Sequence, residues 1–398
     1  MAKISRTIAN LIDNNEVRGG AFALFEGANL LQAGAIGRGR NDMPLSINTM
    51  VRVASISKLA TLLTMMKLVE TGKANLDSDI SAQIGFKLRN PNFPDLIITP
   101  RMVLSHISGV RDGDNYVGKI GETLESFFDP NGENWGNGTH WGKQGAGYFA
   151  YSNLGMGLIA QIIERASNMR FDLAAKALVF DPLGIECGFN WSGVSDDNLI
   201  QSSPLYRRAN GRSDWNVQID SNPISLARPT HNQLEGKTLD DYKIGTNGLA
   251  FSPQGGLRAN IIHLVKLSQV FSGKSLLLNQ KTLFDILKPQ WVFDGKNGEG
   301  ETLNGVESGA FLRFGTGIHQ IPKAAFGPII GLKHDLIGHY GQAYGLLGGL
   351  WVEPQSAKGF AWFVNGSRET PKAGTRTGLF ALEEEIMQAA AHDLGLCQ

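Results

Sequence analysis

The sequence has few cysteines and no long apolar run. Cys187 and Cys397 stand far apart without C-x-x-C spacing, so they fit neither a disulfide scaffold nor a zinc site. No stretch approaches the roughly 20 apolar residues that a membrane-spanning helix needs. Polar and charged residues also interrupt the first apolar run before it reaches the length of a signal-peptide core. We therefore expect a cytoplasmic protein that does not contact a membrane.

The chain has no excess charge of either sign. Lys and Arg together number 37, Asp and Glu together number 37, and basic residues do not cluster. Nucleic acid is therefore a poor candidate as a partner. The 42% hydrophobic composition is typical of a globular protein. Because 398 residues are too many for one compact core of ordinary size, we expect two subdomains or one domain with a large insertion, and a cleft between the two parts as the place for a site.

Several signatures of other enzyme classes are missing. The sequence has no H-E-x-x-H zinc motif, no G-x-S-x-G nucleophile elbow and no Walker-type phosphate loop. His334 and His339 are five residues apart, a spacing that matches no usual pair of metal ligands. We expect neither a metal nor a cofactor.

The hydrophobic pattern predicts an α/β unit built from both ends of the chain. Helices are expected at 4–15, 59–70, 100–106, 153–166, 260–271 and 378–394, and strands at 20–25, 30–35, 50–54, 314–321, 344–352 and 359–364. An antiparallel sheet flanked by helices would then combine with an all-helical subdomain. We assign residues 1–74 and 271–398 to the α/β subdomain and 75–270 to the helical one, with the active site between them.

Ser55-Ile56-Ser57-Lys58 is the one S-x-x-K sequence in the chain, and it follows a predicted strand and begins a predicted helix. Residues three apart share a helix face, so Lys58 can reach the Ser55 hydroxyl and act as its base. A serine at a helix N-terminus also faces free backbone N–H groups, which stabilise an oxyanion. Such a short pattern is expected about once by chance in a chain of this length.

Two further motifs follow in order. Tyr151-Ser152-Asn153 stands at the start of a predicted helix, and His339-Tyr340-Gly341 precedes the late strands. Taken alone, the first also suits a helix cap and the second a structural histidine. A glycine in the second motif lets a strand edge lie close to substrate. The ordered set of three motifs favours nucleophilic catalysis over these separate structural roles.

Together the three motifs resemble those of the β-lactamase-related serine hydrolases, which include class C β-lactamases, D-alanyl-D-alanine carboxypeptidases, D-aminopeptidases, D-amino-acid amidases and family VIII esterases. The segments 104–109, 181–184 and 251–256 look similar too, and the resemblance extends from about residue 15 to 395. It implies the fold of serine β-lactamases and penicillin-binding proteins.

The resemblance also implies a role for each motif residue. Ser55 would be the nucleophile, Lys58 its general base, and Tyr151 a proton relay. The backbone N–H groups of Ser55 and Gln342 would form the oxyanion hole. Asn153 would hold the substrate amide or orient the lysine, and the motif His339, Tyr340 and Gly341 would bind substrate.

The third motif departs from the K-T-G of class C β-lactamases, because His339 replaces a fixed cation. H-x-G resembles instead the version of some D-alanyl-D-alanine peptidases, D-aminopeptidases and D-amino-acid amidases. We therefore expect a serine hydrolase that cleaves amide or peptide bonds of small substrates, D-amino-acid compounds included. A family VIII-type esterase or acyltransferase, and a non-catalytic binding protein on the same fold, remain alternatives. The sequence leaves open the oligomeric state, a homo-oligomer included, and the role of residues 285–335.

Overall fold

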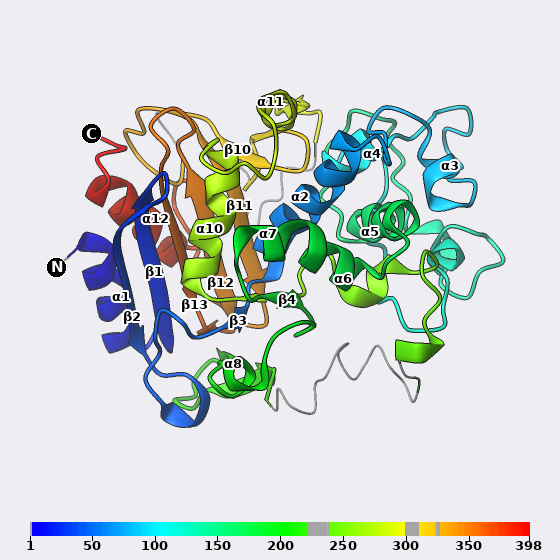
Figure 1. Ribbon diagram of the computed structural model, residues 1–398. Coiled ribbons are helices and arrows are strands. Elements are labelled where there is room, and N and C mark those ends of the chain that lie inside the picture. Colours follow the sequence, from blue (N-terminus) through cyan, green and yellow to red (C-terminus); the bar gives the residue numbers. More distant parts are fainter. Residues whose placement is uncertain (1, 222–236, 238, 299–309, 324–326) are drawn as a thin grey trace.

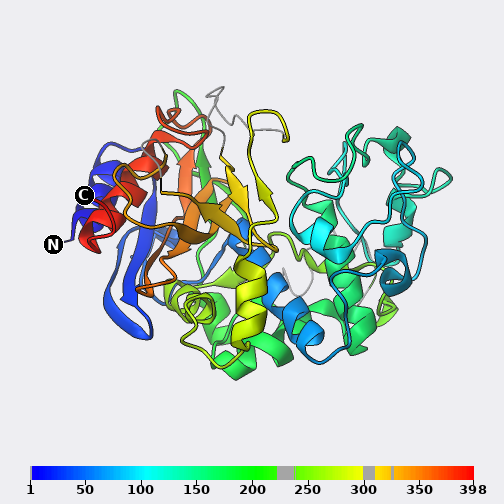
Figure 2. The ribbon, with the colours of Figure 1, turned by 90° about the horizontal axis from the view of Figure 1, so that it is seen from above.

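Strands from both ends of the chain form one eight-stranded sheet in the computed structural model (Figures 1 and 2). The structure describes residues 2–221, 237, 239–298, 310–323 and 327–398. Neighbouring strands are antiparallel throughout. From edge to edge the strands are β2 (Asn29–Gly37), β1 (Gly19–Glu26), β13 (Lys358–Val364), β12 (Leu346–Val352), β11 (Leu336–Ala343), β10 (His319–Ile321), β9 (Arg313–Phe314) and β8 (Trp291–Val292). The predicted antiparallel sheet is confirmed.

Helices cover both faces of this sheet. Helices α1 (Lys3–Asp13) and α12 (Ala381–Asp393) pack together on one face, and α10 (Ile261–Phe271) packs on the other. Side chains alternate along β1, so Phe22 and Leu24 join the cluster of α1 and α12 while Ala21 and Ala23 join the opposite core. Burial on both faces explains why β1 reads as a continuous apolar run.

Turns change two of the predicted strands: one begins two residues later than expected, and the other is a hairpin of two short strands. The expected strand 344–352 begins at β12 only after a turn at Tyr344 and Gly345, whose φ angles are +55° and +86°. The expected strand 314–321 is divided into β9 and β10 by a turn that contains Gly317, whose φ is +72°. The strand expected at 344–352 is present except for its first two residues, whereas the single strand expected at 314–321 was wrong. Both differences have the same cause: apolar residues flank each turn, and hydrophobicity does not indicate a positive φ.

The middle of the chain is mainly helical and lies beside the sheet (Figure 2). Its helices include α5 (Leu154–Ser167) and α4 (Pro100–Leu104), which Thr99 caps by accepting the Met102 N–H. The others are α2 (Ser57–Glu70), α3 (Ile80–Ile84), α6 (Phe171–Ala175), α7 (Asp181–Leu183), α8 (Asp196–Ile200) and, later in the chain, α11 (Gln280–Leu287). In the part of the chain that the structure describes, no helix is long and apolar enough to cross a membrane.

The exact limits of the two subdomains stay a prediction. Helix α10 lies at the end of the range assigned to the helical subdomain, yet it packs on the sheet. Residues 285–335 contribute α11 and β8 to β10, and part of this segment lies outside the described residues. Two small sheets complete the fold: β3 (Val51–Arg52), β7 (Leu257–Ala259) and β4 (Gly188–Phe189), and β14 (Gly366–Arg368), β5 (Leu205–Arg208) and β6 (Asn216–Ile219).

A fully buried ion pair ties the β3–β7–β4 sheet to the loop after β6. Arg258 on β7 is 0% exposed and Asp220 is 1% exposed. The Arg258 guanidinium donates from Nη2 to Asp220 Oδ1 at 2.8 Å and from Nε to Oδ2 at 3.1 Å. Because both charges are removed from water, each depends on the other for compensation.

We expect Asp220→Asn to lower the free energy of unfolding by about 3 kcal/mol, because it leaves the Arg258 charge buried without its counter-ion. Urea unfolding of the purified variant measures this loss as a shift of the midpoint. Asp77→Asn is the matched control, since Asp77 pairs with Arg101 but its side chain is 65% exposed, and it should cost less than about 1 kcal/mol. Equal losses from both variants would contradict the prediction.

Candidate active site

Ser55 lies in a tight turn between β3 and α2. Ala54 before it has a φ of +57°, a left-handed conformation that costs an L-residue roughly 1–2 kcal/mol. The Ser55 N–H donates to the Val53 carbonyl at 2.8 Å, and a 3-10 turn over Ala54–Ile56 leads into α2. The strand-to-helix junction predicted for Ser55 is therefore present, and its backbone is strained, as is common at functional sites.

The Lys58 amine is buried one helical turn beyond Ser55. Lys58 is 2% exposed, and its Nζ lies 3.1 Å from Ser55 Oγ. Nζ also donates to Asn153 Oδ1 and to the Gln254 carbonyl, each at 2.8 Å. The structure thus brings together the serine, the lysine and the asparagine that the sequence singled out. It adds Gln254, whose segment the sequence noted without assigning it a role.

Asp112, which the sequence analysis missed, orients Asn153 and the start of α5. Its Oδ1 accepts the N–H groups of Asn153 at 2.5 Å and Leu154 at 2.9 Å, and its Oδ2 accepts Asn153 Nδ2 at 2.8 Å. The last contact fixes the orientation of the Asn153 side-chain amide: its nitrogen must face the carboxylate, so its oxygen faces Lys58. No local pattern connects two residues 41 positions apart.

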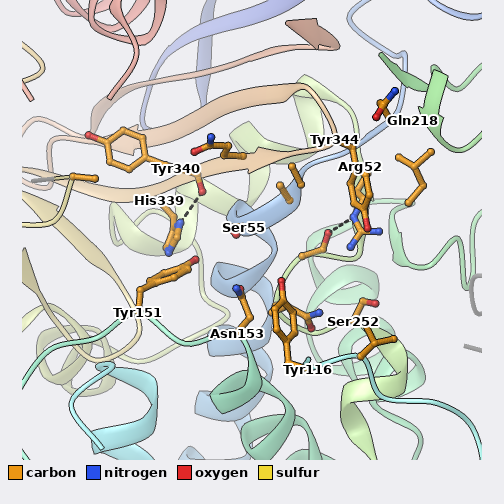
Figure 3. Close-up of a pocket in the computed structure, with 18 of the residues that line it drawn as sticks. Arg52, Ser55, Tyr116, Tyr151, Asn153, Gln218, Ser252, His339, Tyr340 and Tyr344 are labelled. Atoms are coloured by element: carbon orange, nitrogen blue, oxygen red, sulfur yellow. Dashed lines mark hydrogen bonds between the residues drawn. The ribbon is translucent and has the colours of Figure 1, made fainter. Parts of the chain in front are cut away.

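Aromatic rings hold Tyr151 beside the lysine. Its ring stacks on Phe311 with centroids 5.1 Å apart and lies 4.5 Å from the ring of His106. Lys58 Nζ is 4.6 Å from the Tyr151 centroid. His106 is 2% exposed and its Nδ1 accepts the Ser152 N–H at 3.2 Å, so it ties its own loop to the segment of Tyr151. Figure 3 shows the Tyr151 hydroxyl pointing toward the space between Ser55 and His339.

Strand β11 carries the third motif to the turn that holds Ser55. A Cβ on Gly341 would lie 2.6 Å from the Val53 carbonyl oxygen, so glycine is required for this approach. This glycine was predicted to let the strand edge lie close to substrate. In the structure it lets the strand lie close to the turn that holds Ser55. The Tyr340 side chain points away from Ser55 (Figure 3) and packs on Trp351, with centroids 4.7 Å apart.

The backbone N–H of Gln342 faces an open strand edge. Among the described residues, β10 pairs with β11 over Leu336–Gly338 and does not extend further. On the other side, Ala343 and Leu346 flank the two-residue turn and form a hydrogen-bonded pair of the β11–β12 ladder. Because hydrogen-bonding direction alternates along an antiparallel strand, the Gln342 N–H points away from β12. This places it on the side of β11 that borders the cavity.

His339 is a neutral side chain with a free acceptor. Burial, and then the nearby Lys58, lower the pKa of His339 to about 3. Its Nδ1 lies 2.7 Å from the Tyr340 carbonyl, which can only accept, so Nδ1 carries the proton. Nε2 then has a lone pair, and it is buried without a hydrogen-bond partner in the described part of the chain. His339 therefore offers a hydrogen-bond acceptor where class C enzymes have a cation.

A cavity of about 590 Å³ connects these groups. That volume suits a small-molecule site. Ser55, Tyr151, Asn153, His339 and Gln342 all line it. No group of three or more His, Cys, Asp or Glu side chains that could hold a metal ion occurs within the described ranges.

An antiparallel sheet completed by both ends of the chain, with a Ser-x-x-Lys turn beside a helical part, defines the fold of serine β-lactamases and penicillin-binding proteins. The profile of the family described as Beta-lactamase matches residues 4–383. The chain therefore belongs to the β-lactamase family of serine hydrolases.

Curated relatives match over shorter regions. "Serine beta-lactamase-like protein LACTB, mitochondrial" of Homo sapiens is 33% identical over 89 residues, which are 21% of this chain and 15% of that protein. "Penicillin-binding protein 4*" of Bacillus subtilis (strain 168) is 29% identical over 162 residues, which are 36% of this chain and 31% of that protein. The matches thus span less than a third of either relative.

Solved structures share the fold over nearly the whole chain. The octameric penicillin-binding protein homologue from Pyrococcus abyssi has a TM-score of 0.68 at 20% identity, covering 99% of this chain and 77% of that one. The D-amino acid amidase from Ochrobactrum anthropi SV3 has a TM-score of 0.68 at 16% identity, covering 98% of both chains. At these identities the likeness concerns the fold alone.

We expect Asp112→Asn to slow the labelling of Ser55 by a fluorophosphonate at least tenfold. The new amide donates toward N–H groups that the carboxylate accepted, so Asn153 no longer presents its oxygen to Lys58. The second-order rate constant of labelling, read by intact mass well below the unfolding temperature, measures the effect. Asp114→Asn, at an exposed neighbouring position, is the control. Equal labelling rates for the two variants would show that Asp112 does not position the site residues.

Acid should destabilise the protein partly through His339. Its pKa is 6.5 in the unfolded chain and about 3 in the native state, so the native state favours the neutral form. The stability this provides is present above pH 6.5 and is lost as the pH falls toward 3. The loss from pH 6.5 to 5 should be roughly 1.5 kcal/mol smaller in His339→Gln. Urea unfolding across this range tests it, with His334→Gln as the exposed-histidine control; an unchanged slope in His339→Gln would refute it.

Proposed function

We propose that this protein hydrolyses amide or peptide bonds of small substrates, D-amino-acid compounds among them, through an acyl-enzyme on Ser55. The observation that carries the proposal is the position of Lys58 Nζ, 3.1 Å from Ser55 Oγ and 2.8 Å from two acceptor oxygens. A buried amine placed in this way is arranged for proton transfer from the serine.

To act as the base, Lys58 reacts as a neutral amine, which has two N–H bonds and one lone pair. In that form Asn153 Oδ1 and the Gln254 carbonyl accept the two N–H bonds, which directs the lone pair toward the Ser55 hydroxyl. Lys58 takes the proton of Ser55 as Oγ forms a bond to the substrate carbonyl carbon.

Backbone N–H groups at the edge of β11 receive the negative charge that develops on the carbonyl oxygen. The Gln342 N–H faces the open edge and supplies one donor. The Ser55 N–H already donates to the Val53 carbonyl at 2.8 Å, so it shares its hydrogen between that carbonyl and the oxyanion. The Gln342 N–H is then the stronger of the two donors.

Tyr151 passes the proton from Lys58 to the leaving nitrogen as the carbon–nitrogen bond breaks. Its ring lies over Lys58 Nζ at 4.6 Å, and its hydroxyl points into the space beside Ser55 (Figure 3). In the second half of the reaction, water gives a proton to the same relay and its oxygen bonds to the acyl carbon. The bond from that carbon to Ser55 Oγ then breaks, and the serine regains its proton.

His339 favours a leaving group that donates a hydrogen bond. Its Nε2 has a lone pair and no charge at neutral pH, so it accepts from an N–H but does not attract a carboxylate. β-Lactams carry a carboxylate next to the leaving nitrogen and are therefore poor substrates. The likeness to a D-amino acid amidase of the same fold supports an amide substrate, and the octameric homologue supports self-association.

We expect a D-aminoacyl anilide to be turned over with a kcat/KM at least 100-fold above that of a chromogenic cephalosporin. The physical reason is the uncharged acceptor at His339 in place of a cation. Release of nitroaniline and opening of the cephalosporin are both followed by absorbance, with an aryl ester measured alongside. Faster opening of the cephalosporin would contradict the assignment, and turnover of the ester alone would favour an esterase.

Ser55→Ala and Lys58→Ala control this assignment. Both should lose turnover by at least 1,000-fold while keeping the native unfolding midpoint, because serine and base act as a unit. A fluorophosphonate should add one adduct mass to the native protein and none to Ser55→Ala. A native protein that takes up no adduct would instead be a non-catalytic binder on this fold.

A further inference from the structure

The cavity extends past Ser55 to an end that is rich in cationic groups. Arg52, Tyr116 and Tyr344 lie on the side of Ser55 opposite Tyr151 and His339 (Figure 3). Arg207 also lines the cavity. None of these residues has a part in the hydrolytic steps at Ser55.

Arg52 is a buried cation whose terminal nitrogens form no hydrogen bond to any residue that the structure describes. It is 8% exposed, its Nε donates to the Gly255 carbonyl at 2.8 Å, and its guanidinium lies 5.0 Å from the centroid of Tyr344. These contacts fix the plane of the guanidinium. Within the described residues, neither terminal nitrogen has a hydrogen-bond partner and no carboxylate forms an ion pair with Arg52. Two parallel N–H donors are therefore available to a ligand in the cavity.

The nearest buried carboxylate is already engaged. Arg52 and Arg258 are cross-strand neighbours in the β3–β7 pair, and Asp220 forms its bidentate ion pair with Arg258. Of these two buried arginines, Arg258 is the one paired with Asp220. Burial, and then the adjacent Arg258, lower the pKa of Arg52 to about 10, so the side chain keeps its charge at neutral pH.

A second cation lies at the same end. Arg207 is on β5, and its Cα lies 3.5 Å from the position of a Cβ on Gly345, the residue after Tyr344. The turn between β11 and β12 therefore adjoins both arginines. The carboxyl that lines the cavity, Glu383 of α12, is near Tyr340, and burial raises its pKa to about 7. The Arg52 end is thus positive.

We propose that the Arg52 end of the cavity binds a carboxylate carried by the acyl part of the substrate. The inference rests on the proposed function for its direction: the leaving group departs on the side of Tyr151, which protonates it, so the acyl substituent extends to the other side, toward Arg52. The terminal nitrogens of Arg52 take the carboxylate in a bidentate pair, and Arg207 adds a second positive charge. The substrate class is then an amide of a dicarboxylic acid or of an acidic amino acid.

Binding of intact substrates to Ser55→Ala tests this inference without the chemical step. The probes are the p-nitroanilides of succinic, glutaric and adipic acid, each with a free terminal carboxylate, and the matching terminal carboxamides, which have the same shape without the charge. Calorimetry should show at least one carboxylate binding about tenfold or more tighter than its carboxamide. Equal affinities for all three pairs would overturn the proposal.

Variants of Arg52 test whether this residue causes the preference for the carboxylate. Added to Ser55→Ala, Arg52→Gln should remove most of the carboxylate preference, Arg52→Lys should keep part of it, and Arg6→Gln, on the exposed face of α1, should leave it unchanged. The preference is a ratio within one variant, so a general loss of affinity does not imitate it. A preference that survives Arg52→Gln would also overturn the proposal.

The two proposals fail separately. If native protein takes up no fluorophosphonate and turns over none of the anilides, the acyl-enzyme proposal is wrong, whereas the binding ratio in Ser55→Ala still decides the role of Arg52. If the anilides are turned over but carboxylate and carboxamide bind equally, the hydrolase stands and the anionic subsite is wrong.

Discussion

The burial of the Lys58 amine is the constraint on which the site depends. Its Nζ is held by Asn153 Oδ1 from the start of α5 and by the Gln254 carbonyl, and it lies beside Ser55 Oγ on its own helix turn. Removing an amine from water is costly unless its hydrogens are accepted. Three distant segments therefore meet at one atom beside Ser55, and Asp112 takes part because it fixes which atom of Asn153 faces the lysine.

A second constraint acts between two backbones. Gly341 lets β11 approach the Val53 carbonyl, and Ala54 accepts a positive φ so that Ser55 turns toward that strand. The same register leaves the Gln342 N–H on the open edge. The geometry of the candidate site thus depends on main-chain positions as much as on side chains, which explains why the third motif has a glycine, without a Cβ, at position 341.

The sequence predicted the sheet and the main helices, and it singled out candidate site residues that the structure brings together, because each has a short-range pattern. β1 is apolar, Thr99 caps α4, and Ser55 and Lys58 are one helical turn apart. What it could not predict depends on contacts between distant segments. Asp112 reaches Asn153 across a loop, and Arg52 is unusual only because Arg258 has taken the nearby carboxylate. The turn at Tyr344 was not predicted because it lies within an apolar run, and hydrophobicity does not indicate backbone dihedral angles.

The pairing of β1 with β13 has a consequence for how the protein is made. Residues 20–26 pair with residues 358–364, so during synthesis one edge of the first hairpin stays unpaired until residues 358–364 have emerged from the ribosome. Contacts so distant in sequence form late and slowly. Ser55 and Lys58 are translated well before β11, the strand that completes their cavity. The cavity beside Ser55 therefore forms only after β11 has joined the sheet.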